Sequence, residues 1–233
     1  MKKFLTIAAA ALVALSMTSC GGSRAMKSDI DTVSYALGTD FGMSLKRLIG
    51  QVEGEMNMDL FYAGVEDALN DEVVLDQQEA FAFLRNYMNV TNPQKALAAS
   101  EAYLAKIAEN EGVQKTESGL LYEIINEGNA EKKAALDTDK VKVHYEGKLR
   151  NGEVFDSSYE RGEPAEFALN QVIKGWTEGM KLVGEGGEIK LWIPANMAYG
   201  ARGTRDGSIG PNQAIMFTVE VLEVIPTEAQ EEK

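Results

Sequence analysis

Apolar residues recur at helical spacing from Asp29 to about Glu111. The first stripe consists of apolar side chains four residues apart, at Val33, Leu37, Phe41 and Leu45. Side chains at this spacing lie on one face of an α-helix, because a turn takes about 3.6 residues. The pattern therefore predicts that the first half of the chain is helical.

Three short signals divide this helical half. Asp59 is predicted to cap a helix over Leu60–Leu69. Asp76 followed by Glu79 has the spacing of a capping box, so a third helix is predicted to begin there. The Asn-Pro pair at 92–93 fits either the start of a new helix or a bend in a long one, because proline suits a first turn but has no N–H to donate further on.

Short strands and glycine turns replace the helical period from Thr116 onward. Val141–Leu149 and Met216–Val224 alternate apolar and polar residues, which is the period of a half-buried strand. Further strands are predicted over Leu120–Ile125, Val154–Ser157 and Ile189–Ile193, and a short helix over Lys174–Leu182. Strands on either side of a lone helix indicate an α+β domain in which an antiparallel sheet closes over the helix.

The strands at 141–149 and 154–157 are predicted to form a β-hairpin. Asn151-Gly152 between them is the strongest short hairpin signal, because both residues accept a positive φ. His144, the only histidine, falls among the polar positions of the first strand. We therefore expect it to be exposed and to have no catalytic role.

The first residues indicate export. Lys2 and Lys3 precede an apolar run from Phe4 to Leu15, which is too short to span a bilayer and is typical of a signal-peptide core. Small residues then lead to Cys20, the only cysteine, in an arrangement that resembles the lipobox of bacterial lipoproteins. The resemblance implies removal of residues 1–19 and acylation of Cys20, and secretion without a lipid is the alternative.

The charge of the chain excludes one class of partner. The formal net charge is −13, and loss of Lys2 and Lys3 would move it to −15. An acidic chain without a basic patch repels phosphate, so we expect no nucleic-acid binding. A single histidine and a single cysteine make no metal-ligand cluster, and we expect no metal and no cofactor. No second apolar run is long enough to cross a membrane, so a lipid on Cys20 would be the only membrane contact.

An ordered set of motifs in the second half resembles FKBP-type peptidyl-prolyl cis-trans isomerases. The set comprises Tyr145, Phe155-Asp156-Ser157-Ser158, Phe167, Val172-Ile173, Trp176, Ala198-Tyr199-Gly200, Ile209, Pro211 and Phe217. In the first half, Asp31-Thr32-Val33-Ser34-Tyr35 and Gly64-Val65-Glu66-Asp67 resemble, more loosely, the dimeric macrophage-infectivity-potentiator-type members. The implied fold is α+β: an FKBP-like antiparallel sheet wrapped on a short helix, preceded by an all-α dimerisation domain and a long linking helix.

The resemblance implies a pocket that acts without covalent chemistry. The residues expected to be catalytic are Tyr145, Phe155, Asp156, Trp176, Tyr199 and Phe217. Those expected to contact the substrate are Phe167, Val172, Ile173 and Ile209. Trp176 would form the floor beneath the proline ring, and Asp156 would orient Tyr145. The N–H of Ile173 and the hydroxyl of Tyr199 would hold substrate carbonyls. The loop 201–208 would overhang the pocket. It has Arg202, Arg205 and Asp206 but no histidine. This departure from the family pattern leaves open the substrate preference and the affinity for the family's macrolide inhibitors.

These inferences combine into one hypothesis. The predicted segments are a signal peptide (1–19), a flexible tether (20–28), a helical dimerisation domain (29–115), an isomerase domain (116–226) and a disordered tail (227–233). The expected partners are proline-containing unfolded or nascent envelope proteins and a second copy of the chain. The expected protein is an outer-membrane lipoprotein that faces the periplasm and rotates Xaa-Pro bonds during folding. The alternative is a non-catalytic holdase chaperone or a dimeric scaffold.

Overall fold

The computed structural model describes residues 25–227, so the predicted signal peptide, Cys20 and residues 228–233 lie outside the described part of the chain. The chain divides into two compact units, Met1–Gly42 and Met43–Lys233. The division falls inside helix α1 (Asp29–Gly50) and not at the predicted boundary near residue 115, which stays a prediction. Within residues 25–227, none of the helices combines the length and the apolar character that a membrane span requires.

The first half is helical, as the periodicity predicts. Helix α2 (Met58–Asn70) is capped by Asn57, whose side chain accepts a hydrogen bond of 3.1 Å from the N–H of Leu60. The prediction that Asp59 caps this helix was wrong, because Asp59 already lies in the first turn, where its charge favours the helix dipole. Helix α3 (Gln77–Asn86) begins with the predicted capping box of Asp76 and Glu79.

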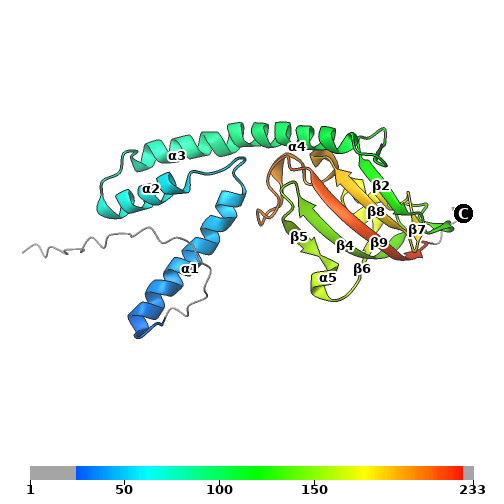
Figure 1. Ribbon diagram of the computed structural model, residues 1–233, viewed down its shortest axis with the longest axis horizontal. Helices are drawn as coiled ribbons and strands as arrows, with labels where there is room; N and C mark the ends of the chain where they lie inside the picture. The colour runs from blue at the N-terminus through cyan, green and yellow to red at the C-terminus, as the bar shows by residue number, and fades with distance from the viewer. Residues whose placement is uncertain (1–24, 228–233) are drawn as a thin grey trace, which may run out of the picture. The chain divides into compact units, whose positions relative to one another are not determined.

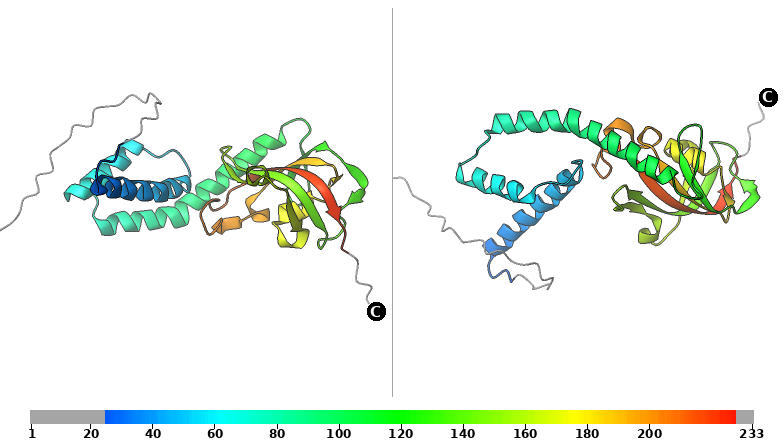
Figure 2. Two further views of the ribbon diagram at one scale, coloured as in Figure 1. Left: turned by 90° about the horizontal axis from the view of Figure 1, so that it is seen from below. Right: turned by 45° about the horizontal axis from the view of Figure 1, so that its top comes forward.

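The Asn-Pro pair lies inside one long helix. A π-helical turn, Tyr87–Thr91, joins α3 to α4 (Asn92–Ala108), and Figures 1 and 2 show these segments following one another as a single rod. Asn92 is itself helical, with φ −62° and ψ −47°, so the helix continues and a new one does not start there. A proline inside a helix clashes with the carbonyl four residues earlier, and the wider π turn lies where that clash would occur.

Asn92 is fully buried and connects the long helix to the turn that follows α1. Its side-chain oxygen accepts a hydrogen bond of 2.6 Å from the N–H of Glu53, and its side-chain nitrogen donates one of 2.7 Å to the carbonyl of Gln51. A buried amide with both groups paired in this way fixes the two segments against each other.

The second half is an antiparallel sheet with the strand order β1-β2-β8-β9-β4-β5, in which β6 also pairs with β4. Its strands are β1 (Gln114–Lys115), β2 (Leu121–Asn126), β4 (Lys140–Leu149), β5 (Val154–Ser157), β6 (Ala165–Ala168), β8 (Glu188–Ile193) and β9 (Ile215–Ile225). The separate pair is β3 (Asn129–Lys133) with β7 (Gly184–Glu185), and the two short α-helices are α5 (Ser158–Arg161) and α6 (Lys174–Gly179). The five strands and the helix predicted in this half are confirmed, whereas β1, β3, β6, β7 and α5 were not predicted.

The β4–β5 hairpin forms, but through a different turn from the predicted one. Gly152 has φ 85°, whereas Asn151 is not in the left-handed region. The N–H of Gly152 donates to the carbonyl of Leu149, and the N–H of Leu149 donates to the carbonyl of Glu153, so the loop has three residues. A three-residue loop needs a positive φ only at its last position, which the glycine occupies.

Helix α6 packs unusually close to β8 because it carries two glycines four residues apart. A Cβ atom on Gly175 would lie 2.4 Å from Cγ2 of Ile193, and one on Gly179 would lie 2.7 Å from Cδ1 of Leu191. Both glycines are buried, and they bring the helix backbone against the sheet. The close approach fixes the position of Trp176, which lies between them in the sequence.

Asp139 anchors the start of β4. Its carboxylate is 2% exposed and accepts hydrogen bonds of 2.8–2.9 Å from the N–H groups of Ala135, Leu136 and Thr227. Burial alone would raise the pKa of this carboxyl, but the three N–H donors and Lys181 outweigh it and lower the pKa. The anion therefore holds together two segments that enter and leave the sheet.

Candidate functional site

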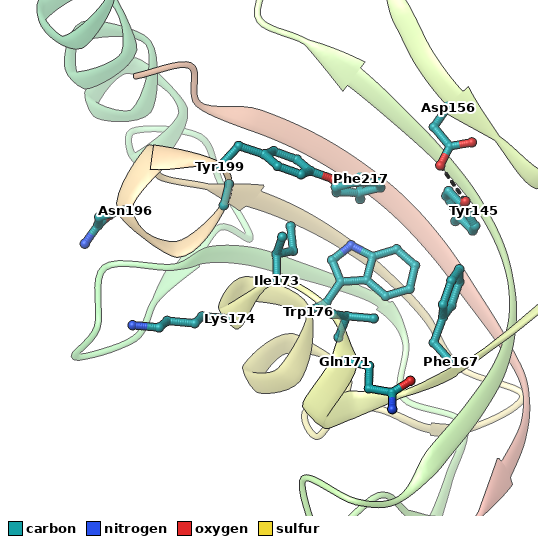
Figure 3. Close-up of a pocket in the computed structure, with 12 residues that line it drawn as sticks. Tyr145, Asp156, Phe167, Gln171, Ile173, Lys174, Trp176, Asn196, Tyr199 and Phe217 are labelled. Carbon is teal, nitrogen blue, oxygen red and sulfur yellow. Dashed lines mark hydrogen bonds between the residues drawn. The ribbon is translucent and has the colours of Figure 1, made fainter. Parts of the chain in front are cut away.

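A pocket of about 600 Å³ opens beside α6, and Figure 3 shows the side chains around it. Eight of the ten residues predicted for the site line this pocket: Tyr145, Asp156, Phe167, Val172, Ile173, Trp176, Tyr199 and Phe217. They come from β4, β5, β6, the segment before α6, α6 itself, the turn after β8, and β9. The fold therefore brings together residues that are up to 72 positions apart in the sequence, counting from Tyr145 to Phe217.

Trp176 forms the floor of the pocket and is held by three aromatic rings. Tyr145, Phe167 and Phe217 meet the indole at centroid distances of 5.2, 5.5 and 5.1 Å and at interplanar angles of 84–89°. These edge-to-face contacts are favourable for aromatic rings, because the positive edge of one ring meets the negative face of another. The indole is consequently fixed in one orientation, with only 4% of its residue surface exposed.

The indole N–H of Trp176 is buried and has no hydrogen-bond partner among residues 25–227. Leaving such a donor unpaired costs about 1–3 kcal/mol. Buried unpaired groups are uncommon in native proteins and occur where a site has a function beyond stability. At the floor of this pocket, the close packing of the aromatic rings therefore outweighs the cost of leaving an N–H without a hydrogen bond.

Phe155 and Ile209, the other two predicted site residues, are not among the lining residues. Phe155 is half-buried and meets the ring of Phe217 edge-on at 5.5 Å. Both rings lie over Gly147, where a Cβ atom would come within 2.7 Å of each. Phe155 thus packs against Phe217, a residue of the pocket wall. Ile209 is 2% exposed and belongs to the hydrophobic core, where an apolar side chain between two turns is best buried.

The polar edge of the pocket is a group of three side chains. The Tyr145 hydroxyl donates a 2.6 Å hydrogen bond to Asp156, which confirms the expected contact between them. Arg161 donates a hydrogen bond of 2.7 Å to the Tyr145 hydroxyl and forms an ion pair with Asp156. Burial raises the pKa of Tyr145, and Asp156 raises it further against the opposing effect of Arg161. Sequence reasoning missed Arg161, whose only signal is its position five residues after Asp156 in the unpredicted helix α5.

The two hydrogen-bond donors that the resemblance implies for substrate carbonyls are free for a ligand. The Tyr199 hydroxyl has no hydrogen-bond partner in the described part of the chain, and burial, followed by Asp156 and Asp206, raises the pKa of this group. It therefore stays protonated at neutral pH. Ile173 directly precedes α6 with extended backbone angles (φ −64°, ψ 149°), so its N–H is not needed by the helix.

The pocket has four lining residues that were not among the predicted site residues: Gln171, Lys174, Asn196 and Ala198, of which only Ala198 belongs to a motif of the resemblance. Lys174 is the one cation and Asp156 the one carboxylate among the twelve lining residues. In Figure 3, Lys174 and Asn196 point to the same side, away from Tyr145 and Asp156. The two ends of the pocket therefore differ in charge.

The loop 201–208 contributes no lining residue, although Asp206 is close enough to the pocket residue Tyr199 to raise its pKa. The loop also lies against the turn after α1, since a Cβ atom on Gly207 would come 2.0 Å from the side-chain nitrogen of Gln51. Within the loop, the Thr204 hydroxyl and then Ser208 stabilise the Asp206 anion and lower its pKa to about 2.

His144 is half-buried and not exposed, so that prediction was wrong. Its Nδ1 lies 3.0 Å from the hydroxyl oxygen of Ser158, and its ring stacks on Tyr159 at 4.7 Å. Helix α5 covers this face of β4, which is why a polar strand position is not open to solvent. His144 does not line the pocket. Within residues 25–227, no group of three or more His, Cys, Asp or Glu side chains is placed to hold a metal ion.

The fold and the pocket define a class of protein, and comparison with known sequences agrees with it. Residues 131–222 match the FKBP-type peptidyl-prolyl cis-trans isomerase family, and residues 30–124 match the domain amino terminal to FKBP-type peptidyl-prolyl isomerase. The chain therefore belongs to the FKBP-type family and is a peptidyl-prolyl cis-trans isomerase.

Named relatives cover most of the chain. A probable FKBP-type isomerase of Haemophilus influenzae is 40% identical over 215 residues, which cover 85% of this chain and 86% of the relative. FkpA, an FKBP-type isomerase of Escherichia coli, is 37% identical over 230 residues, covering 93% of this chain and 84% of the relative. The crystal structure of FkpA from Escherichia coli is similar with a TM-score of 0.54 and covers 87% of this chain and 99% of that one. The α+β fold with an amino-terminal helical domain and a long helix is confirmed.

Proposed function

We propose that this isomerase binds an Xaa-Pro segment with the proline ring on Trp176 and lowers the barrier to rotation without covalent chemistry. The observation that carries the proposal is the aromatic floor, in which three rings hold the indole edge-on. None of the twelve lining residues is a serine, threonine, cysteine or histidine, so the pocket has no such nucleophile.

The physical basis is the loss of amide resonance during rotation. The barrier to rotation of a peptide bond is roughly 18–20 kcal/mol, and the twisted form is less dipolar than the planar one. Water stabilises the more dipolar planar form, whereas an apolar pocket does so less. A site that binds the twisted form better than either planar isomer accelerates rotation.

The polar groups then position the substrate. The Tyr199 hydroxyl and the Ile173 N–H, both free for a ligand, donate to substrate carbonyls on either side of the bond. Asp156 and Arg161 hold the Tyr145 hydroxyl so that the ring keeps its place at the wall. Phe155 acts through Phe217 and is a positioning residue.

Isomerisation of short Xaa-Pro peptides by the full-length protein tests the proposal. We expect clear acceleration, inhibition by a macrolide of the kind that binds FKBPs, and a loss of activity in Tyr199→Phe and Asp156→Ala. Tyr122→Phe is the matched control, because it removes a tyrosine hydroxyl that is bonded to Gln114 away from the pocket. Unchanged activity in Tyr199→Phe and Asp156→Ala would contradict the proposed roles.

We further propose that the chain forms a homodimer through its amino-terminal helices. Helices α1, α2 and α3 contain no buried residue, and large apolar side chains on them are open to solvent, among them Leu60 (71% exposed) and Leu69 (79%). Burial of one such side chain is worth about 1.5–3 kcal/mol, so the helices gain most of their stability from a partner. Sedimentation that shows a monomer at micromolar concentration would refute the dimer.

The same exposed side chains favour the second candidate function, which is to hold unfolded chains. Large apolar patches on a surface are typical of protein-binding sites. Suppression of aggregation of a proline-free client by the full-length protein, with the isomerase pocket blocked by a macrolide, would support holdase activity. Loss of that suppression on blocking the pocket would place client binding at the pocket and not at the helices.

We propose that the protein acts in the cell envelope, as an outer-membrane lipoprotein that faces the periplasm and assists the folding of proline-containing envelope proteins. The support is the signal-peptide pattern and the lipobox-like residues before Cys20. Growth with labelled palmitate tests the anchor, which would be refuted if a Cys20→Ala protein incorporated as much label as the natural protein.

A further inference from the structure

A second concavity, of about 340 Å³, begins where the isomerase pocket ends. It lies between the carboxyl-terminal half of α4 and the segment that enters the sheet. We name it the α4 groove and define it by its main lining residues: Leu104, Ala105, Ala108, Leu121, Pro194 and Asn196. Asn196 lines both the groove and the isomerase pocket, so the two concavities lie next to each other at this residue.

The groove is preformed because α4 is fastened to the sheet domain. The Ser100 hydroxyl donates a 2.7 Å hydrogen bond to the carbonyl of Asn212 and accepts one of 3.0 Å from the N–H of Ala214. The side-chain nitrogen of Asn212 donates a further 2.9 Å bond to the carbonyl of Pro93. Helix and sheet thus form two walls whose spacing is set before any ligand binds.

The chemistry of the groove suits an apolar side chain attached to a peptide backbone. Five of its ten lining residues are leucine, alanine or proline, and it carries one charge of each sign, Glu101 and Lys115. It therefore does not select a net charge. The exposed amide of Asn196, at the junction, both donates and accepts hydrogen bonds, as an extended backbone requires.

We propose that the α4 groove binds the part of the substrate chain that flanks the proline, and that it selects an apolar residue there. The inference rests on the proposed binding of proline at Trp176. A chain held there and leaving past Asn196 reaches the groove, because an extended chain advances about 3.3–3.6 Å per residue. The second contact is then intramolecular and needs little affinity of its own. The occupant is thus a segment of unfolded client protein with an apolar residue a few positions from the proline.

The experiment compares short and extended substrates in full-length variants. The short substrate is a blocked peptide with two residues on each side of proline. The extended substrates add three residues on the amino or the carboxyl side, either leucines or serines. Ala105→Trp fills the groove, and Ala102→Trp is its control, since both alanines are exposed on α4 and only Ala105 lines the groove.

In the natural protein we expect a leucine extension on one side to raise kcat/KM about tenfold over the matching serine extension, equivalent to about 1.4 kcal/mol. Ala105→Trp should abolish that gain and leave the short peptide unaffected, and Ala102→Trp should change neither. Equal rates on leucine and serine extensions in the natural protein would overturn the proposal. So would an Ala105→Trp protein that loses activity on the short peptide or changes its sedimentation, because the residue would then serve the pocket or a subunit contact. Failure of the natural protein on the short peptide would count against the proposed isomerase pocket.

Discussion

Trp176→Phe separates the stability of the pocket from its activity. The substitution keeps an aromatic ring on the floor but removes the indole N–H that has no hydrogen-bond partner among the described residues. Trp192 in β8 provides the comparison, because it is also buried but is not among the buried groups that lack a partner, and it acts to lower the pKa of Tyr103. The two tryptophans thus differ in the surroundings of their N–H groups.

The structure sets the size of the effect. Indole to phenyl removes two ring carbons, which is worth roughly 1.6 kcal/mol at about 0.8 kcal/mol per carbon, and a small cavity adds to this cost. At Trp176 the substitution also removes an unpaired buried donor, which stabilises the folded state by about 1–3 kcal/mol. This gain offsets the lost packing, so the free energy of unfolding should change by less than about 1 kcal/mol. Trp192→Phe loses the same two ring carbons without removing an unpaired donor, so we expect the free energy of unfolding to fall by about 2 kcal/mol or more.

Urea unfolding followed by circular dichroism gives both free energies, and peptide isomerisation gives kcat/KM. Trp176→Phe should lower kcat/KM by about tenfold or more, because the smaller ring leaves the proline without part of its floor. Trp192→Phe should retain activity, since Trp192 does not line the pocket. Equal destabilisation by the two substitutions would refute the reasoning, because it would mean that the Trp176 N–H is satisfied in the folded protein.

Three further predictions concern charged groups. Because the pKa of Asp139 is lowered in the folded protein, the carboxylate stabilises the fold fully above its ordinary pKa, and this stabilisation is lost as the pH falls through the lower folded value. Asp139→Asn should therefore reduce the free energy of unfolding, measured by urea titration, by about 2–4 kcal/mol at pH 7. The reduction should become progressively smaller at lower pH. Because Arg161 acts to lower the pKa of Tyr145, Arg161→Gln should raise that pKa further in an ultraviolet titration. The same substitution should lower kcat/KM several-fold. An unchanged titration would exclude the contact between the two side chains. At the other end of the pocket, we expect the Lys174 ammonium to give the natural protein a preference of about two- to five-fold for acidic over basic residues beside proline, and Lys174→Glu should reverse it. Identical preferences in the natural protein and the variant would show that the ammonium takes no part in binding.

The sequence predicted the elements whose signal is local. Alternation along Val141–Leu149 and Met216–Val224 marked the two long central strands, and Asp76 with Glu79 marked a helix start that the structure confirms. The prediction failed for short edge elements such as β6, because four residues give too little periodicity to separate strand from loop. It also failed at Asn151, where the loop length decided the turn type and the Asn-Gly pair alone did not.

The pocket was predictable as a set, but its supporting groups were not. The eight lining residues that were predicted belong to motifs with a fixed order in the chain. Arg161 meets Tyr145, and Asn196 reaches the pocket, only in the folded chain, and nothing in their neighbourhoods in the sequence marks them. Phe155 contacts the lining residue Phe217 and is not itself among the lining residues, and its role in the site stays a prediction.

The π-helical turn at Tyr87–Thr91 gives the long helix a point of evolutionary adjustment. Such a turn holds one residue more than an α-helical turn, so the loss of a single codon there would restore a regular helix without breaking it. Because the extra residue is absorbed within that single turn, the deletion would leave α3 and α4 nearly in phase about the helix axis. One-residue insertions and deletions at this position would thus preserve the face of α3 that is presented, while the pocket, built from later residues, kept its form.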